Sequence, residues 1–372
     1  ASNGTNMIWA TYYGGGSWDL PHSVWVDENK DVYIGGTTQS SNLPMHAQAY
    51  DNSLGGSWDI YLCKISANGT QLLGSTFLGG EGIEGQQFTW TATNVTSSNN
   101  GSVTTPVQVY KDKSGNVWVV SNTNSVNFPV TANAQYQTSA GGIDGTITKM
   151  NNNLTSILYS TYIGGAANDG LNSMVEQSDG TLVMAGITYS SNLPSPNGLQ
   201  PASGGGQDGF VLRVHPTTHM IINLTYLGTS ATDHSVGVQV DCGDNIFVLG
   251  RTAGNYPVSP GVWNSGTAFM PSSFMVDLCG RIYVGGFGAS AGLFTTADAY
   301  QTVQKSFYLI TLEANFTDVV YASYFGVTTS DHNHIGSHRL DPKGFFYHTI
   351  CNINQFTPVN PAVYQPSKVS SG

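Results

Sequence analysis

Charged side chains are scarce in this sequence of 372 residues, where Asp, Glu, Lys and Arg together make up 9%, against roughly 25% in ordinary soluble domains. The 12 basic residues do not cluster, and the formal net charge is −11. Because phosphate binding needs clustered lysine and arginine, this balance argues against a nucleic-acid partner. No apolar run approaches the ~20 residues that a membrane helix needs, so we expect no membrane span.

Cysteine is also rare, with 4 residues and no Cys-x-x-Cys pair, which argues against a zinc knuckle. Cys242 and Cys279 hold matching positions in adjacent repeats, and an oxidising compartment would allow a disulfide between them. The alternative is a pair of small buried turn residues. No signal peptide is visible, and a start at Ala1 without methionine fits either a processed chain or one trimmed by an experimenter.

One phrase of five residues, here called the glycine phrase, recurs along the chain. It reads Thr-Tyr-Tyr-Gly-Gly from residue 11, Thr-Phe-Leu-Gly-Gly from residue 76 and Thr-Tyr-Ile-Gly-Gly from residue 161. Looser copies, Thr-Tyr-Leu-Gly-Thr and Ser-Tyr-Phe-Gly-Val, start at residues 225 and 323. Internal repeats of this kind decide the architecture before any other signal does.

Each unit between two glycine phrases follows the same order. A short apolar strand leads through a turn rich in Asp, Asn and Gly into a second strand. A long loop with an Asn-x-Pro signature comes next, at residues 42–44, 127–129, 192–194 and 255–257, and leads into a third strand. A fourth strand carries the next glycine phrase. Four short strands per unit and no helical period predict one blade of a β-propeller.

The predicted fold class is therefore all-β, a single β-propeller of about six four-stranded blades that takes up residues 1–372. The strand Ile8–Tyr13 has no partner before it, and we expect it to close the last blade, which removes open sheet edges. Too few residues separate Trp263 from Phe274 for two strands, so the fourth blade is incomplete or lacks residues. The predicted blades span approximately residues 20–80, 85–165, 170–229, 234–270, 271–327, and 332–372 with 1–15.

These units resemble the SBBP family of β-propeller repeats, which occurs in secreted and surface proteins of bacteria. The resemblance is carried by Tyr-Ser-Thr-Tyr-Ile-Gly-Gly at residues 159–165, Asn-Phe-Pro at 127–129 and Tyr-Gln at 136–137. Residues 277–284 and 341–344 are similar to variants in large surface proteins of Bacteroidota, often exported by the type IX secretion system. The resemblance implies an extracellular or outer-membrane-associated location and supplies no catalytic residues.

An acidic residue recurs five positions after the first glycine of each phrase. Because this position begins the innermost strand, the carboxylates are expected to lie around one mouth of the central channel. Oxygen ligands of this kind would suit a shared Ca²⁺ ion, whereas the alternative is that each carboxylate caps the N–H groups of its own loop. The residues of this series are Asp19, Glu84, Asp169, Asp233 and Asp331.

Two further series of acids have structural interpretations. Asp59, Asp144 and Asp208 open third strands and are expected to hold the Gly-rich loops before them. A series at the hairpin turns is expected to serve those turns, and it consists of Asp27, Glu176, Asp241, Asp277 and Asp341. The run Asp331-His332-Asn333-His334 invites a metal interpretation, but Asp233-His234 repeats it in another unit, which favours a feature of the repeat.

No nucleophile motif stands out, and the sequence predicts binding or display, or a scaffold role, rather than catalysis. The partner would be a protein or a glycan, bound on the face that carries the long aromatic-rich loops. One alternative is a subunit that packs on an outer-membrane or secretion assembly. Another is an enzyme that acts on polysaccharide with its site at the channel mouth, since paired carboxylates of a glycosidase are compatible with the sequence. No cofactor is expected other than the Ca²⁺ considered above.

Overall fold

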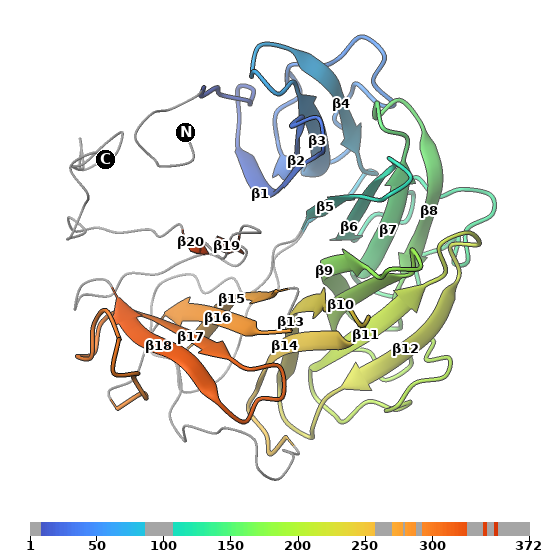
Figure 1. Cartoon of the computed structure of the whole chain (residues 1–372). Helices are drawn as coiled ribbons and strands as arrows, with labels where there is room; N and C mark the ends of the chain where they lie inside the picture. Colours follow the sequence, from blue (N-terminus) through green and yellow to red (C-terminus); the bar gives the residue numbers. More distant parts are fainter. Residues whose placement is uncertain are drawn as a thin grey trace. The chain divides into compact units, whose positions relative to one another are not determined.

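The computed structural model describes residues 9–85, 107–256, 270–277, 280–287, 292–325, 338–340 and 346–348. Within these ranges the chain forms twenty strands and no helix (Figure 1). Accordingly, the described part contains no helix that could cross a membrane. The prediction of an all-β fold is confirmed.

The strands form six antiparallel sheets among the described residues, four of them four-stranded, as the sequence predicted for a blade. The first three sheets are β1 (Asp19–Val26), β2 (Val32–Thr38), β3 (Asp59–Ile65) and β4 (Leu72–Leu78); β5 (Gln108–Lys111), β6 (Val117–Thr123), β7 (Asp144–Met150) and β8 (Ile157–Ile163); and β9 (Asp169–Glu176), β10 (Leu182–Thr188), β11 (Asp208–Val214) and β12 (Ile221–Leu227). The others are β13 (Asp233–Val240) and β14 (Ile246–Thr252); β15 (Met270–Val276), β16 (Ile282–Phe287), β17 (Phe307–Leu312) and β18 (Val319–Phe325); and β19 (His338–Leu340) and β20 (Phe346–His348).

The chain divides into two compact units. The larger unit holds residues 11–240 and 248–256, and the smaller one holds residues 1–10, 241–247 and 257–372. The number of blades and the closure of a ring stay predictions. The N-terminal strand expected over residues 8–13 is not formed where it can be seen, because residues 9–13 belong to no strand, and Ile8 lies outside the described residues.

Consecutive sheets of the larger unit pack face to face, and this packing makes its core. The first and second sheets share a cluster that includes Tyr33, Leu62 and Val119. The second and third sheets share another, around Trp118 and Phe210. Strands enclosed in this way, such as β3, β6, β7 and β10, are buried along their whole length. The apolar runs at the start of β6 and β10 therefore follow from burial on both faces.

The hairpin between the first and second strand of a sheet uses one turn repeatedly. Oδ1 of Asp27 accepts the N–H of Asp31, four residues ahead, and Asp112, Asp241 and Asp277 do the same. Positive φ values at Lys30, Gly115 or Asp244 close these turns. In the third sheet the residue at this position is Gln177 and not Glu176, which instead accepts the hydroxyl of Tyr110 in the second sheet.

Candidate functional site

The glycine phrase holds the long loop of its own sheet through its threonine and its aromatic residue. The hydroxyl of Tyr162 donates to the carbonyl of Ser125 at 2.8 Å and accepts the N–H of Phe128 at 2.9 Å. Tyr226 makes the same two bonds to Ser190 and Leu193. Because such loop groups are buried and have no ladder partner, the tyrosine supplies the hydrogen bonds that they need. The phrase is thus a structural signature and not a catalytic motif.

The second glycine of the phrase makes room for the loop of the next sheet. A β-carbon at Gly80 would lie 2.6 Å from both Ser125 Cβ and Asn127 Oδ1, so no larger residue fits there. The asparagine is the first residue of the Asn-x-Pro signature, and its Oδ1 accepts the N–H of Glu81 at 3.0 Å. The loops that follow the second and fourth strands therefore meet at the same ends of neighbouring sheets. We call this side of the larger unit the loop face.

The predicted series of acids lies on the loop face. Asp19, Asp169 and Asp233 begin the innermost strands β1, β9 and β13, whereas Glu84 forms an isolated bridge with Thr123 and precedes β5. Glu84, Asp169 and Asp233 are buried, with 0–2% of their surfaces exposed, and Asp19 is half-buried. Each accepts hydrogen bonds from nearby loops: Asp19 from Gly15 N–H, Glu84 from the hydroxyls of Thr123 and Ser125, Asp169 from Gly165 N–H and the hydroxyls of Thr188 and Ser190, and Asp233 from Thr229 N–H. Asp331 lies outside the described residues.

The acids that open third strands also hold their loops. Asp59 accepts the N–H of Gly55 at 2.8 Å, Asp144 that of Ala140 at 2.8 Å and Asp208 that of Gly204 at 2.9 Å. The sequence does not reveal that each of them lies beside an acid of the first series from the following sheet. The first glycine of the phrase, which is the same in every copy in this chain, could have indicated this pairing. Its small size leaves room for the two carboxyl groups to approach each other.

Burial governs the electrostatics of these acids. Desolvation raises the pKa of Glu84 to about 7, and the nearby Asp59 carboxyl adds to the shift against the lowering effect of the Ser125 and Thr123 hydroxyls. Desolvation likewise raises the pKa of Asp169 to about 6, with a smaller contribution from Asp144. The pKa values of Asp59 and Asp208 are also raised, again mainly by desolvation. These carboxyl groups therefore ionise less readily than exposed ones.

No group of three or more His, Cys, Asp or Glu side chains in the described part of the chain is placed to hold a metal ion. The shared Ca²⁺ site stays a prediction, and one of its five acids is not described. His234 is buried against Gln207 Oε1, and burial lowers the pKa of its imidazole to about 3. Cys242 is exposed, whereas Cys279 lies outside the described residues, so the disulfide between them also stays a prediction.

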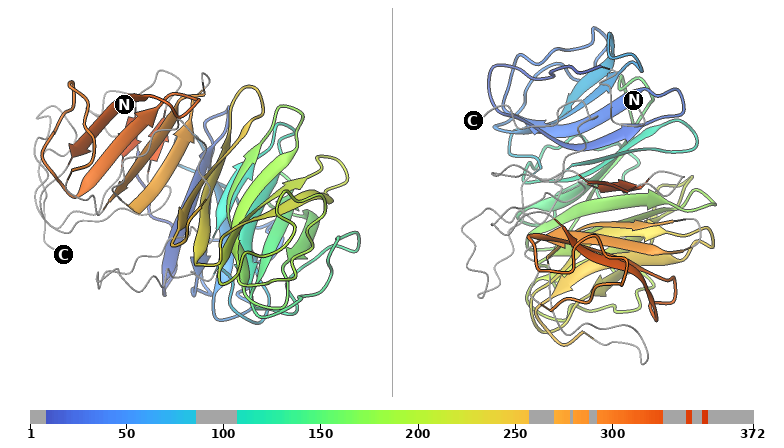
Figure 2. Two further views of the ribbon diagram at one scale, coloured as in Figure 1. Left: turned by 90° about the horizontal axis from the view of Figure 1, so that it is seen from below. Right: turned by 60° about the vertical axis from the view of Figure 1, so that its left-hand side comes forward.

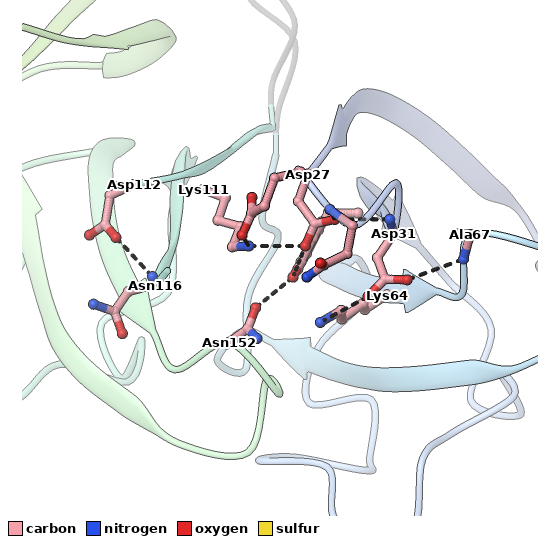
Figure 3. A network of polar contacts seen from close by, with 11 residues as sticks. Asp27, Asp31, Lys64, Ala67, Lys111, Asp112, Asn116 and Asn152 are labelled. Atoms are coloured by element: carbon pink, nitrogen blue, oxygen red, sulfur yellow. Dashed lines mark hydrogen bonds and ion pairs between the residues drawn. The ribbon is translucent and has the colours of Figure 1, made fainter. Parts of the chain in front are cut away.

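A network of buried charges lies at the opposite ends of the strands, on the hairpin side (Figure 3). Nζ of Lys111, on β5 of the second sheet, contacts Asp27 Oδ2 at 2.9 Å and Glu28 Oε1 at 2.8 Å in the first sheet. Lys64 contacts Asp31 at 3.5 Å within the first sheet. Every carboxylate in these contacts has a lysine partner, so this network joins sheets without leaving an uncompensated charge.

Exposed aromatic and large apolar side chains gather on segments of the loop face. They come from the segment before β1 and from the loops after β2, β6 and β10. These residues are Trp18 at 68% exposure, Tyr50 at 40%, Val126 at 81%, Tyr189 at 42% and Leu199 at 92%. Figure 2 shows the backbone of the loops at the ends of the strands. The loops after β6 and β10 are held by the tyrosine bonds described above, so Val126, Tyr189 and Leu199 stand on a fixed framework.

Residues 8–44 match the family model of a β-propeller repeat, SBBP. This stretch contains the first glycine phrase, the first hairpin and the first Asn-x-Pro signature. A comparison with curated protein sequences gives no match. The resemblance to SBBP repeats predicted from the sequence is confirmed over these residues.

Among solved structures, the chain is similar to the extracellular domain of a putative one-component system from B. thetaiotaomicron, with 14% identity and a TM-score of 0.28, over 88% of this chain and 32% of that one. It therefore spans about a third of that protein's length. A protein of unknown function from Dyadobacter fermentans has 10% identity, coverage of 92% and 77%, and a TM-score of 0.33. A GH43_1 enzyme from Xanthomonas citri has 10% identity, coverage of 90% and 91%, and a TM-score of 0.35. At these scores none of the three bears on function, and what the chain is similar to is the SBBP β-propeller repeat, over residues 8–44.

Proposed function

We propose that this chain is a non-catalytic binding or display module of a secreted or surface-exposed bacterial protein, and that it recognises a protein or glycan through the loop face. The observation that carries the proposal is the set of exposed side chains on that face, of which Trp18, Val126 and Leu199 are more than two-thirds exposed. Aromatic and apolar side chains on rigid supports are the usual anchors of recognition.

The burial of the acids supports a non-catalytic role. A general acid or nucleophile must reach its substrate, yet Glu84, Asp144 and Asp169 have at most 1% of their surfaces exposed. An enzyme acting on polysaccharide is the alternative, and release of reducing sugar by the intact chain would establish it. A third possibility, packing on an outer-membrane or secretion assembly, predicts copurification with that assembly from native membranes. The route of export, including the type IX system, is part of the proposal.

The decisive experiment compares two sides of the larger unit. The intact chain is used to probe a glycan array and the surface proteins of a Bacteroidota cell, and bound molecules are identified by mass spectrometry. We expect the double variant V126S/L199S to lose the bound partner by at least tenfold. The matched control is Met220→Ser, an exposed position at 39% in the turn between β11 and β12, on the hairpin side. Equal binding by both variants would contradict a role for the loop face.

The proposal includes a six-bladed single domain with the blade ranges given above, in which residues 8–13 complete the sheet that contains β19 and β20. Its support is Tyr12, which is fully exposed at 103%, while Phe77, Tyr162 and Tyr226 at the same position of the phrase are buried. Deleting residues 1–13 should lower the melting temperature of the whole chain, because an unmatched sheet edge is left. An unchanged melting temperature would overturn this closure.

A further inference from the structure

Buried carboxyl groups meet in pairs where one sheet of the larger unit follows another. Asp59 on β3 lies beside Glu84, which enters the second sheet, and Asp144 on β7 lies beside Asp169 on β9. The first glycine of the phrase marks each meeting point. A β-carbon at Gly79 would lie 2.7 Å from both Asp59 Oδ1 and Glu84 Oε2, and one at Gly164 would collide with Asp144 Oδ1 and lie 3.1 Å from Asp169 Oδ2.

Each pair contains an oxygen atom that is buried without a hydrogen-bond donor. Glu84 Oε2 and Asp144 Oδ1 have no partner, although both residues are at least 99% buried. The remaining oxygens of these residues are occupied, those of Glu84 by the Thr123 and Ser125 hydroxyls and those of Asp144 by its own loop. The unpartnered oxygen is the one on the side of the neighbouring carboxyl group. A buried lone pair without a hydrogen-bond donor costs free energy unless a proton or a cation lies beside it.

No positive charge balances these pairs within the described residues, because no ion pair there includes any of the four carboxyl groups. The groups that face the first pair are the Thr123 and Ser125 hydroxyls, the Tyr162 phenol and a further acid, Asp51. Those that face the second pair are the hydroxyls of Ser139, Thr188 and Ser190 and the phenols of Tyr162 and Tyr226. A third pair, Asp208 with Asp233, differs from these two because His234 follows Asp233 in the chain and the half-buried Arg251 interacts with that imidazole.

We propose that the pairs Asp59–Glu84 and Asp144–Asp169 each hold one proton, shared between the two carboxyl groups, at pH values where exposed carboxyl groups are fully ionised. Two adjacent carboxylates without a cation cannot both stay ionised in a buried site, and a shared proton satisfies the unpartnered oxygen at the same time. The contacts between consecutive sheets are then more stable at low pH, and they become less stable when the pH rises and the shared proton dissociates.

The sign of the effect follows from the raised pKa values. A carboxyl group whose pKa is higher in the folded chain than in the unfolded chain binds its proton more tightly when folded. The folded state is therefore favoured below the unfolded value, near 4.3, and this advantage is lost as the pH rises through the folded value. For Glu84 the folded value is about 7, so the loss falls between roughly pH 4.5 and 7.5.

The test compares Glu84→Gln with the parent chain at pH 5 and pH 8 by denaturant unfolding. Glutamine keeps an acceptor for Thr123 and Ser125 but has no proton to lose. Relative to the parent, the variant should gain stability as the pH rises, on the order of 10- to 100-fold in the folding equilibrium constant. Comparing the variant with the parent at each pH cancels the contribution of the histidines to stability, which has the opposite sign. The control is Glu81→Gln, an exposed acid three residues away that belongs to neither pair.

A second readout counts the proton directly. Calorimetric unfolding at pH 6 in two buffers of different ionisation enthalpy gives the number of protons released, and the parent should release about one more than Glu84→Gln. If that variant does not fold, Asp59→Asn removes the other carboxyl group, and proton release should then fall only in part, because desolvation still raises the pKa of Glu84. A pH-independent ratio with equal proton release would overturn the proposal. So would a parent chain that EDTA destabilises at pH 8 and Ca²⁺ restores, because a metal ion would then occupy the gap.

Discussion

The first and third sheets are built from the same repeat, yet their innermost strands differ sharply in burial. On β9, Leu171 and Met174 are buried, because this strand is enclosed by the second sheet and by β13. On β1, Val24 and Val26 are 45% and 54% exposed. The repeat therefore specifies the strand and its turns, whereas the neighbouring sheet supplies most of the burial. The burial of a sheet of this type therefore depends on the neighbouring sheet that packs against it.

The largest effect on stability is expected from removing a lysine of the ion pairs. Lys111→Met removes the cation that joins the second sheet to the first and leaves the buried Asp27 carboxylate unpaired. We expect unfolding to become easier by about 3 kcal/mol. Lys113→Met is the matched variant in the same hairpin, since its exposed side chain bonds only to carbonyls of Gln177 and Ser178 in the third sheet. A loss well below 1 kcal/mol is expected there, and equal losses in urea titrations would contradict this contrast.

The first glycine of the phrase should tolerate alanine in one sheet and not in the other. At Gly164 the new β-carbon would collide with the enclosed Asp144 carboxyl, which has no free space to move into. At Gly14 it would meet Oδ2 of Asp19 at 2.9 Å, and that side chain is half-exposed and can turn away. Gly164→Ala should cost about 2 kcal/mol and Gly14→Ala under about 1 kcal/mol in denaturant unfolding. A Gly14→Ala chain as unstable as Gly164→Ala would show that Asp19 is fixed after all.

Replacing the tyrosine of the phrase tests the loop bonds alone. Tyr226→Phe leaves the Ser190 carbonyl and the Leu193 N–H without their partner, which should cost about 1–2 kcal/mol. Tyr12 has no such bonds in this structure, so Tyr12→Phe should change little if residues 9–13 stay exposed in solution. Closure of the ring by this segment instead predicts a loss similar to that of Tyr226→Phe. Melting temperatures of the two variants, measured side by side, therefore distinguish the open from the closed form.

Acid should act on His234, a buried histidine of β13. Burial lowers the pKa of His234 to about 3, so the folded chain favours the neutral imidazole. That contribution is present above the unfolded value near 6.5 and is lost as the pH falls toward the folded value. Between pH 7 and 5, His234→Gln should recover about 1 kcal/mol relative to the parent. His46→Gln, in a half-buried loop, is the control, and an identical response of both variants would rule out His234 as the source.

Much of the fold could be predicted from the sequence because its repeats are regular. The hairpins around Asp27 and Asp241 and the second strands such as β6 and β10 were recognisable from turn residues and apolar runs. Asp19, Asp169 and Asp233 begin innermost strands as predicted, whereas Glu84 precedes β5 and Asp331 lies outside the described residues. Their pairing with Asp59 and Asp144 could not be predicted, because it depends on the distance between sheets. The unformed strand at residues 9–13 has a similar cause, since a strand exists only beside a partner and the sequence shows only its propensity.

The fit of Gly80 against Ser125 and Asn127 has a consequence for how such chains can grow. The sequence repeat and the sheet are offset from each other, because the glycine phrases at Gly15, Gly80 and Gly165 contact loops that lie between 26 and 46 residues later in the sequence. A duplication that begins and ends within the phrase would copy both halves of every such contact. One that begins and ends at a sheet boundary would also add a sheet, but would join a phrase to whatever loop happens to follow. Recombination within the phrase would therefore lengthen the chain while keeping these contacts. It would also leave a nearly identical phrase at every junction.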